Sequence, residues 1–167
     1  MNITAPPFPA NCQTTAMGIM PHKDMDRALE LALSLDIAFW PQLPNVSYYE
    51  DMYVQASEYF PGIQVDLEAQ RITLNIDQFR EEVAGAYMDR VAQQDTFVLS
   101  ERYARVYSRF LELDLASYTA IRGQIIGPVS FGFRVNDQER KPIIYNDEVC
   151  TILFDFLQRK VNAQYHQ

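Results

Sequence analysis

The stretch Tyr118–Phe133, YTAIRGQIIGPVSFGF, decides the fold that the sequence predicts. Apolar and more polar positions alternate over residues 121–126, which is typical of a strand with one apolar face. Gly127 and Pro128 follow at once. Since Gly127 has no side chain and Pro128 fixes φ at about −65°, this pair can bring the backbone close to whatever occupies the mouth of a sheet. An ordinary strand-to-loop exit would use the same two residues, so both interpretations stay open.

The composition is that of one globular domain. The chain has 167 residues, of which 48% are hydrophobic, enough to build a core of its own. It contains no apolar run of about 18 residues that could span a membrane, and its N-terminus lacks the basic and apolar regions of a secretory signal. We therefore expect a cytoplasmic protein without a membrane partner. The formal net charge of −8 disfavours binding to nucleic acid, because the phosphate backbone requires a surplus of Lys and Arg.

The chemistry-bearing residues form no recognisable catalytic or metal-binding motif. Cys12 and Cys150 lie far apart without the spacing of a zinc site or a disulfide framework, so we expect free thiols and no metal in this chain. No pair of carboxylates has a spacing that requires one shared acid–base site.

Hydrophobic periodicity and turn residues predict a mixed α/β order of elements. The expected elements are an extended Pro-rich lead-in over Met1–Asn11, a strand near Thr15, a helix capped by Asp24, a strand near Ile37, a helix opened by a capping box of Ser47 and Glu50, a hairpin over Ile63–Ile76, helices over Asp77–Gln94 and Ser100–Leu113, the strand at Ile121, a second hairpin between Arg134 and Pro142, and a last helix capped by Asn146. In the last helix, the inward positions are expected to be Val149, Cys150, Leu153, Phe154, Leu157 and Val161.

Five short motifs occur in an order that resembles a known superfamily. They are Met17–His22 (MGIMPH), Phe39–Pro44 (FWPQLP), Phe60–Ile63 (FPGI), Gly127–Ser130 (GPVS) and Lys141–Tyr145 (KPIIY). Together they resemble the N-terminal part of the superfamily that contains cobalamin-independent methionine synthase and uroporphyrinogen decarboxylase, with the greatest likeness to its short methionine-synthase-like members. The likeness extends over nearly the whole chain but over only part of that fold.

The resemblance implies a partial (β/α)8 barrel of the TIM type. A complete barrel of this kind has eight strands and about 250 residues. Residues 1–167, taken as a single domain, would supply about the first three βα units, with β-hairpin insertions and with strands near Thr15, Ile37 and Ile121. In the methionine-synthase branch, the later part of the barrel binds zinc through His and Cys. Zinc is therefore expected only in a complementing C-terminal half.

Six residues are expected from the resemblance to contact a small-molecule substrate: Gly18, His22, Gln42, Gly127, Pro128 and Ser130. Ile19 stands where the family usually has Ser, so a hydroxyl that could bind a substrate carboxylate is missing. His22 could bind an anionic group or could cap the following helix. Gln42 could point to the barrel mouth or belong to a simple turn. The resemblance identifies no catalytic residue in this chain.

Three function hypotheses follow. In the first, the chain is the N-terminal part of a methionine-synthase-like methyltransferase barrel, inactive alone, which needs a second chain for zinc and catalysis. In the second, it is a non-catalytic small-molecule-binding or accessory subunit, a partial barrel that associates with itself. In the third, it is a degenerate or truncated gene product that folds by self-association. Whether the chain belongs to an enzyme stays open. All three hypotheses require a partner, a complementing half-barrel or another copy, because an open parallel sheet leaves its edge and the apolar face around Ile121 uncovered.

Overall fold

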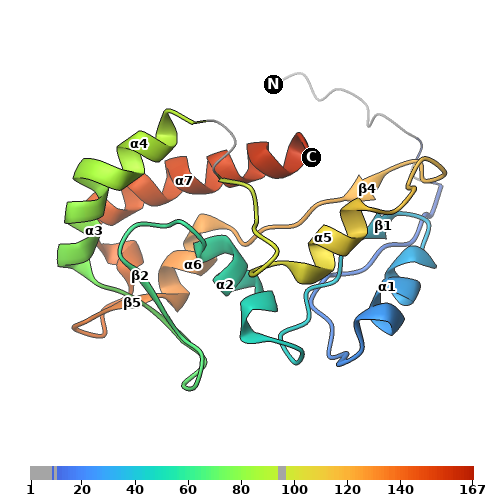
Figure 1. The fold of residues 1–167 in the computed structure, drawn as a ribbon, viewed down its shortest axis with the longest axis horizontal. Helices are drawn as coiled ribbons and strands as arrows, with labels where there is room; N and C mark the ends of the chain where they lie inside the picture. Colours follow the sequence, from blue (N-terminus) through green and yellow to red (C-terminus); the bar gives the residue numbers. More distant parts are fainter. Residues whose placement is uncertain (1–8, 10, 94–96) are drawn as a thin grey trace.

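The computed structural model describes residues 9, 11–93 and 97–167. These residues form a mixed α/β fold with two small sheets and no closed barrel in the described ranges (Figure 1). The expected lead-in over Met1–Asn11 lies almost entirely outside them. The helices are α1 (Met25–Leu33), α2 (Met52–Ser57), α3 (Ile76–Glu82), α4 (Met88–Val91), α5 (Arg105–Leu111), α6 (Pro128–Arg134) and α7 (Asp147–Tyr165). Within this part of the chain, no helix is both long and apolar enough to cross a membrane.

A small parallel sheet joins segments that are distant in sequence. Strands β1 (Ala38–Phe39) and β4 (Ile121–Arg122) pair in parallel. The segment expected as a strand near Thr15 is extended beside β1, where it makes one parallel bridge between Ile19 and Gln42. The three segments expected as strands are therefore parallel neighbours. Strands β1 and β4 have only two residues each, however, and the first segment makes only one bridge.

The second sheet contains the predicted hairpin. Strands β2 (Ile63–Asp66) and β3 (Arg71–Leu74) pair antiparallel, which confirms the alternation and the turn between them. The second predicted hairpin is reduced to one antiparallel bridge between Asn136 and Pro142. Its first residues instead form β5 (Asn136–Asp137), which pairs in parallel with β3.

Capping side chains fix two of the helix starts as predicted. The carboxylate of Asp24 accepts hydrogen bonds from two backbone amides at the start of α1. The amide oxygen of Asn146 accepts from the first turn of α7. The predicted capping box at Ser47 is wrong in part: Ser47 caps a short 3-10 helix (Tyr48–Glu50), and Asp51 caps α2. The Glu50 side chain is buried and accepts hydrogen bonds from Gln55 and from the Val106 amide.

Two predicted helices differ in detail from the sequence expectation. The helix predicted over Asp77–Gln94 is divided into α3, a π-helical turn (Val83–Tyr87) and α4, and its predicted last residue, Gln94, lies outside the described residues. The helix predicted from Ser100 begins only at Arg105. The segment after Gly127 is helix α6 rather than a strand-to-loop exit, and Pro128 occupies the first helical position, where its fixed φ is compatible with a helix.

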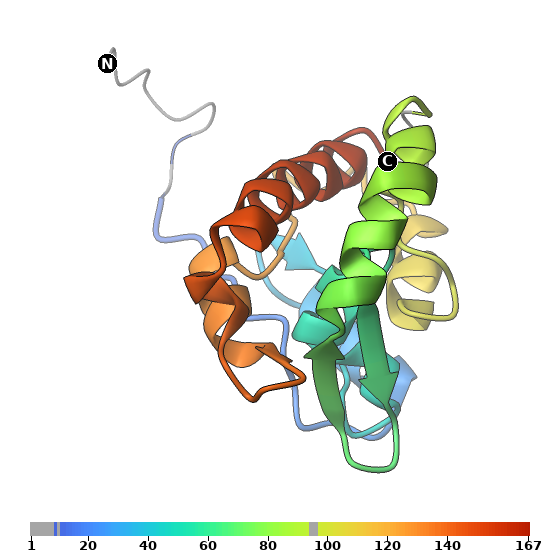
Figure 2. The same ribbon diagram turned by 90° about the vertical axis from the view of Figure 1, so that its left-hand side faces the viewer.

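The core consists of two hydrophobic clusters. The hairpin-side cluster joins α2, the β2–β3 hairpin, α3, α6 and α7, and includes Val54, Phe60, Leu74, Phe79, Phe131, Leu153 and Phe156. The sheet-side cluster joins α1, β1 and α5, and includes Ala28, Leu29, Phe39, Trp40, Leu43, Val106 and Phe110. Helix α7 runs from the α3 end of the molecule toward β4, and the hairpin projects on the opposite side (Figures 1 and 2).

Candidate functional site

Polar side chains converge where the parallel segments end. Gln42 follows β1 and Gln124 follows β4, so both lie at the carboxyl ends of parallel strands, the edge at which open α/β sheets bind ligands. Gln124 accepts a hydrogen bond from the Gly18 amide (N to Oε1, 2.8 Å) and donates one to the Trp40 carbonyl (Nε2 to O, 3.0 Å). One side chain thus ties all three parallel segments together.

A chain of buried amides leads from Gln42 to a buried carboxylate. Gln42 donates to Gln55 on α2 (Nε2 to Oε1, 2.6 Å), and Gln55 donates to Glu50 (Nε2 to Oε2, 3.0 Å). The other Glu50 oxygen accepts from the Val106 amide at 3.2 Å. Burial raises the pKa of Glu50, and these hydrogen bonds oppose that rise.

The hydrogen bonds of Gln55 fix the orientation of Gln42. Because Nε2 of Gln55 donates to both Glu50 and the Tyr103 carbonyl, its Oε1 must face Gln42. Gln42 therefore presents its nitrogen to Gln55. Its own Oε1 is buried and has no hydrogen-bond partner among the described residues. An unpaired buried acceptor of this kind is costly unless a donor reaches it.

Lys160 approaches the same place from α7. Its side chain is 1% exposed, and Nζ donates to the Gln55 carbonyl at 3.2 Å. The ammonium also lies 5.7 Å from the centroids of the Tyr59 and Phe156 rings. Burial lowers the pKa of Lys160 to about 8, against an opposing effect of the Glu58 carboxylate.

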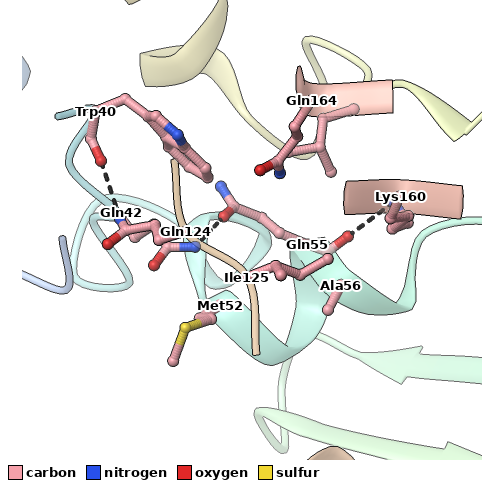
Figure 3. A pocket seen from close by; sticks show the side chains of 10 residues that line it. Trp40, Gln42, Met52, Gln55, Ala56, Gln124, Ile125, Lys160 and Gln164 are labelled. Carbon is pink, nitrogen blue, oxygen red and sulfur yellow. Dashed lines mark hydrogen bonds between the residues drawn. The ribbon is translucent and has the colours of Figure 1, made fainter. Parts of the chain in front are cut away.

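These groups surround a very small cavity (Figure 3). Its volume of about 10 Å³ is that of one water molecule. The lining includes Trp40, Gln42, Gln55, Gln124, Ile125, Lys160 and Gln164. The lining is mixed, since four glutamines and Lys160 border it together with the apolar residues Trp40, Met52, Ala56, Leu99 and Ile125.

A larger apolar groove of about 630 Å³ adjoins this cavity. It runs beside β4 between α5 and the end of α7, and it shares Trp40, Gln124, Ile125 and Gln164 with the cavity. Ile121, which lines the groove, is 49% exposed. The groove has the size of a small-molecule site, which is usually between about 300 and 1,000 Å³.

The six residues expected from the sequence fall into two groups. Gly18 and Gln42 lie together, since the Gln42 amide donates to the Gly18 carbonyl at 2.7 Å. His22 does not line the cavity or the groove, and its Nδ1 is buried without a partner in the described part of the chain. The remaining three belong to the start of α6 and line neither space: Gly127, Pro128 and Ser130.

Sequence reasoning missed Gln55, Gln124, Gln164 and Lys160. A signal for Lys160 was present, because it continues the buried stripe of α7 formed by Val149, Leu153, Phe156 and Leu157. Two positions predicted to face inward, Phe154 and Val161, are 49% and 46% exposed. The buried stripe is therefore rotated relative to the prediction, toward Phe156 and Lys160.

The arrangement can bind polar groups but contains no metal-binding cluster. Among residues 9, 11–93 and 97–167, no group of three His, Cys, Asp or Glu side chains could hold a metal ion. Both Cys12 and Cys150 are free. No protein-family model matches the chain, and neither the curated proteins nor the solved structures contain a match.

Proposed function

We propose that this chain provides the small-molecule-binding part of a methionine-synthase-like methyltransferase barrel and that a second polypeptide supplies zinc and catalysis. The observation that carries the proposal is the meeting of Gly18, Gln42 and Gln124 at the carboxyl ends of three parallel segments. Barrel enzymes build their active sites at this end of the sheet. This chain would therefore contribute ligand-binding groups, and the second polypeptide would contribute the strands that bind the metal.

The open edge of β4 supports the need for a partner. In the described residues, β4 pairs only with β1, and Ile121 is half exposed. A further parallel strand paired with β4 would satisfy its free backbone groups and cover Ile121. The zinc-binding His and Cys side chains of the resembled family belong to such later strands.

The test is reconstitution with a candidate second polypeptide that carries His and Cys ligands, beginning with those encoded beside this chain. We expect the purified complex to hold one zinc ion and to methylate homocysteine, whereas each chain alone does not. Ile121→Lys should abolish complex formation, while Val129→Lys, at a similarly exposed site on α6, should not. Methyl transfer by the isolated chain, or a complex without zinc and activity, would refute the proposal.

A second candidate function is a non-catalytic binding subunit, and the groove beside β4 favours it. Its volume of about 630 Å³ is that of a small-molecule site, and its lining residues all belong to this chain. Ligand binding without chemistry would need no second polypeptide. Ligand binding by the chain together with failure of every reconstitution would support this second function.

A further inference from the structure

We propose that a polar hollow on the β2–β3–β5 sheet binds a small phosphorylated polyol, whose phosphate group is held by Arg71 and Arg140. The hollow has a volume of about 400 Å³, near the lower end of the range for small-molecule sites. It shares no lining residue with the cavity or the groove described above. The inference therefore goes beyond the proposed function and requires neither zinc nor a second polypeptide.

The strand register places four polar side chains on one face of this sheet (Figure 1). Arg71 and Thr73 are two residues apart on β3, so their side chains point to the same side. Gln64 on β2 and Asn136 on β5 both pair with Thr73, and they complete a row across the three strands. All four residues line the hollow, whereas the alternate residues of β3 are buried in the hairpin-side cluster. The polar face is therefore the outer face of the sheet.

Two guanidinium groups at the hollow have no partner in the described part of the chain. Arg71 and Arg140 both line it and are exposed. Neither side chain forms a hydrogen bond, an ion pair or a ring contact with another described residue. The planar guanidinium group can donate two parallel hydrogen bonds to the oxygens of a phosphate. Two arginines at one hollow therefore favour a phosphate group as the ligand.

The carboxylates near these arginines are engaged in turns. Oδ1 of Asp137 accepts hydrogen bonds from two backbone amides of the turn after β5, both at 2.9 Å. Oδ1 of Asp66, which lies opposite Arg71 in the register, accepts from two amides of the hairpin turn at 3.1 and 2.9 Å. Of the described residues that line the hollow, only Asp137 is acidic. The lining therefore has a net positive charge, although the whole chain has a formal net charge of −8.

Two amide side chains of the lining add hydrogen-bond donors. Oδ1 of Asn75 accepts from the Gln78 backbone amide at 3.0 Å, and Oε1 of Gln138 accepts from the Ile76 backbone amide at 3.1 Å. Because these bonds fix the two oxygens, the NH2 groups of Asn75 and Gln138 stay available as donors. A lining rich in donors requires a ligand rich in acceptor oxygens, which a phosphate ester provides.

The remaining space suits hydroxyl groups. The hollow is larger than one phosphate group, and the rest of its lining includes Gln64, Thr73 and Asn136. Amide and hydroxyl side chains both donate and accept, as the hydroxyl groups of a polyol do. The described lining contains no aromatic ring, and its one aliphatic residue, Leu74, is 1% exposed. An apolar ligand body would therefore find no partner here.

The experiment compares three probes that separate the phosphate from the polyol: glycerol 3-phosphate, inorganic phosphate and glycerol. Isothermal titration calorimetry of the purified chain at pH 7 and one fixed ionic strength measures their affinities, since salt screens exposed arginines. We expect saturable binding of glycerol 3-phosphate at one site. Inorganic phosphate should bind more weakly, and glycerol at least tenfold more weakly, because it lacks the charged hydrogen bonds to the arginines.

Variants locate the binding site. Arg140 has a φ of 65°, in the left-handed region that favours glycine, so Arg140→Gly removes the guanidinium group and relaxes the backbone. We expect this variant to fold and to bind glycerol 3-phosphate at least tenfold more weakly. Gln70→Gly is the matched control, because Gln70 is exposed, has a φ of 48° and lies outside the hollow. Arg71→Gln should weaken binding like Arg140→Gly, whereas Arg27→Gln, at an exposed site on α1, controls for the change in net charge.

The outcomes decide for or against the inference. No saturable binding of glycerol 3-phosphate, equal affinity for inorganic phosphate or for glycerol, or unchanged binding in Arg140→Gly and Arg71→Gln would overturn it. An equal loss in Arg27→Gln would also overturn it, because the effect would then be one of net charge. Failure of the zinc complex to form would leave the inference intact, since these titrations use the chain alone. A working zinc complex without binding of glycerol 3-phosphate would remove this inference and leave the proposed function.

Discussion

The backbone amide of Gly18 donates a hydrogen bond to Oε1 of Gln124, 106 residues further along the chain, at 2.8 Å. A Cβ atom built on Gly18 would lie 1.4 Å from Nε2 of the same side chain. Position 18 must therefore be glycine as long as Gln124 keeps this place. The Gly18 backbone and the Gln124 side chain together hold the extended segment against β4.

This contact predicts a measurable coupling between the two positions. Gly18→Ala should displace the Gln124 side chain, which loses its bonds to Gly18 and Trp40, and so lower the free energy of unfolding by about 2 kcal/mol. In a Gln124→Ala background, the same change should cost nothing further. Urea unfolding of both single variants and the double variant measures the coupling. Additive losses would contradict the contact.

Glu50 should be the acceptor on which the amide network depends. Glu50→Ala leaves the Val106 amide and Nε2 of Gln55 without this acceptor, so we expect a loss of about 3 kcal/mol in the free energy of unfolding. Glu50→Gln should lose less, because one acceptor oxygen remains. Chemical denaturation at pH 7 gives both values, with Glu81→Ala on the exposed face of α3 as the control. Equal stability of Glu50→Ala and the control would show that the network contributes little.

The raised pKa of Glu50 also predicts a pH dependence. Because the pKa of Glu50 is higher in the folded chain than in the unfolded chain, protonation of Glu50 stabilises the fold. This stabilisation is fully present below the ordinary carboxyl pKa and is lost as the pH rises through the pKa of Glu50 in the folded chain. The wild type should therefore gain stability relative to Glu50→Gln as the pH falls from 7 to 5. A constant difference over this range would contradict a raised pKa.

Lys160 predicts the opposite behaviour at alkaline pH. Its folded pKa of about 8 lies below the ordinary value of 10.5, so the unfolded chain binds the extra proton between these values. The wild type should gain on the order of 3 kcal/mol relative to Lys160→Met as the pH rises through this window. Urea unfolding of both proteins at pH 7, 8, 9 and 10 tests this, and the comparison cancels titrations common to both. Parallel pH profiles would mean that Lys160 keeps an ordinary pKa.

The half-exposed Ile121 leads us to expect association of the isolated chain. Light scattering over a dilution series should give a dimer or larger species for the wild type. Ile121→Lys should give a monomer, because burying the new charge in an interface is unfavourable. Val129→Lys, at a similarly exposed position on α6, should associate like the wild type. A wild-type chain that stays monomeric at all concentrations would disprove the expectation.

The sequence predicted those elements whose signals are local. Asp24 and Asn146 cap helices through bonds to amides two or three residues away, and the β2–β3 hairpin follows from alternation and a short turn. Helix α6 was missed because a Gly-Pro pair is equally typical of a turn and of a helix start. The choice depends on Phe131 and Val135, which pack into the hairpin-side cluster, and that contact is not visible in a window of sequence.

The candidate site was harder to predict from the sequence, because its hydrogen bonds join residues that are far apart in the chain. Gln42 was identified, but its partner Gln55 lies on a helix whose buried face could be assigned only as apolar. Lys160 was missed because a lysine is expected at the surface unless paired, although it occupies the next position of a buried stripe. The rest of the expected barrel stays a prediction.

Helix α2 has a consequence for how the molecule unfolds. Val54 and Ala56 pack in the hairpin-side cluster, while Gln55 between them is bonded to Gln42, and Glu50 just before the helix is bonded to the α5 backbone. If the sheet-side cluster opened alone, these buried polar groups would lose their hydrogen-bond partners. The two clusters should consequently melt in one cooperative transition, with slowly exchanging amides of β1 and of α7 reporting the same opening free energy.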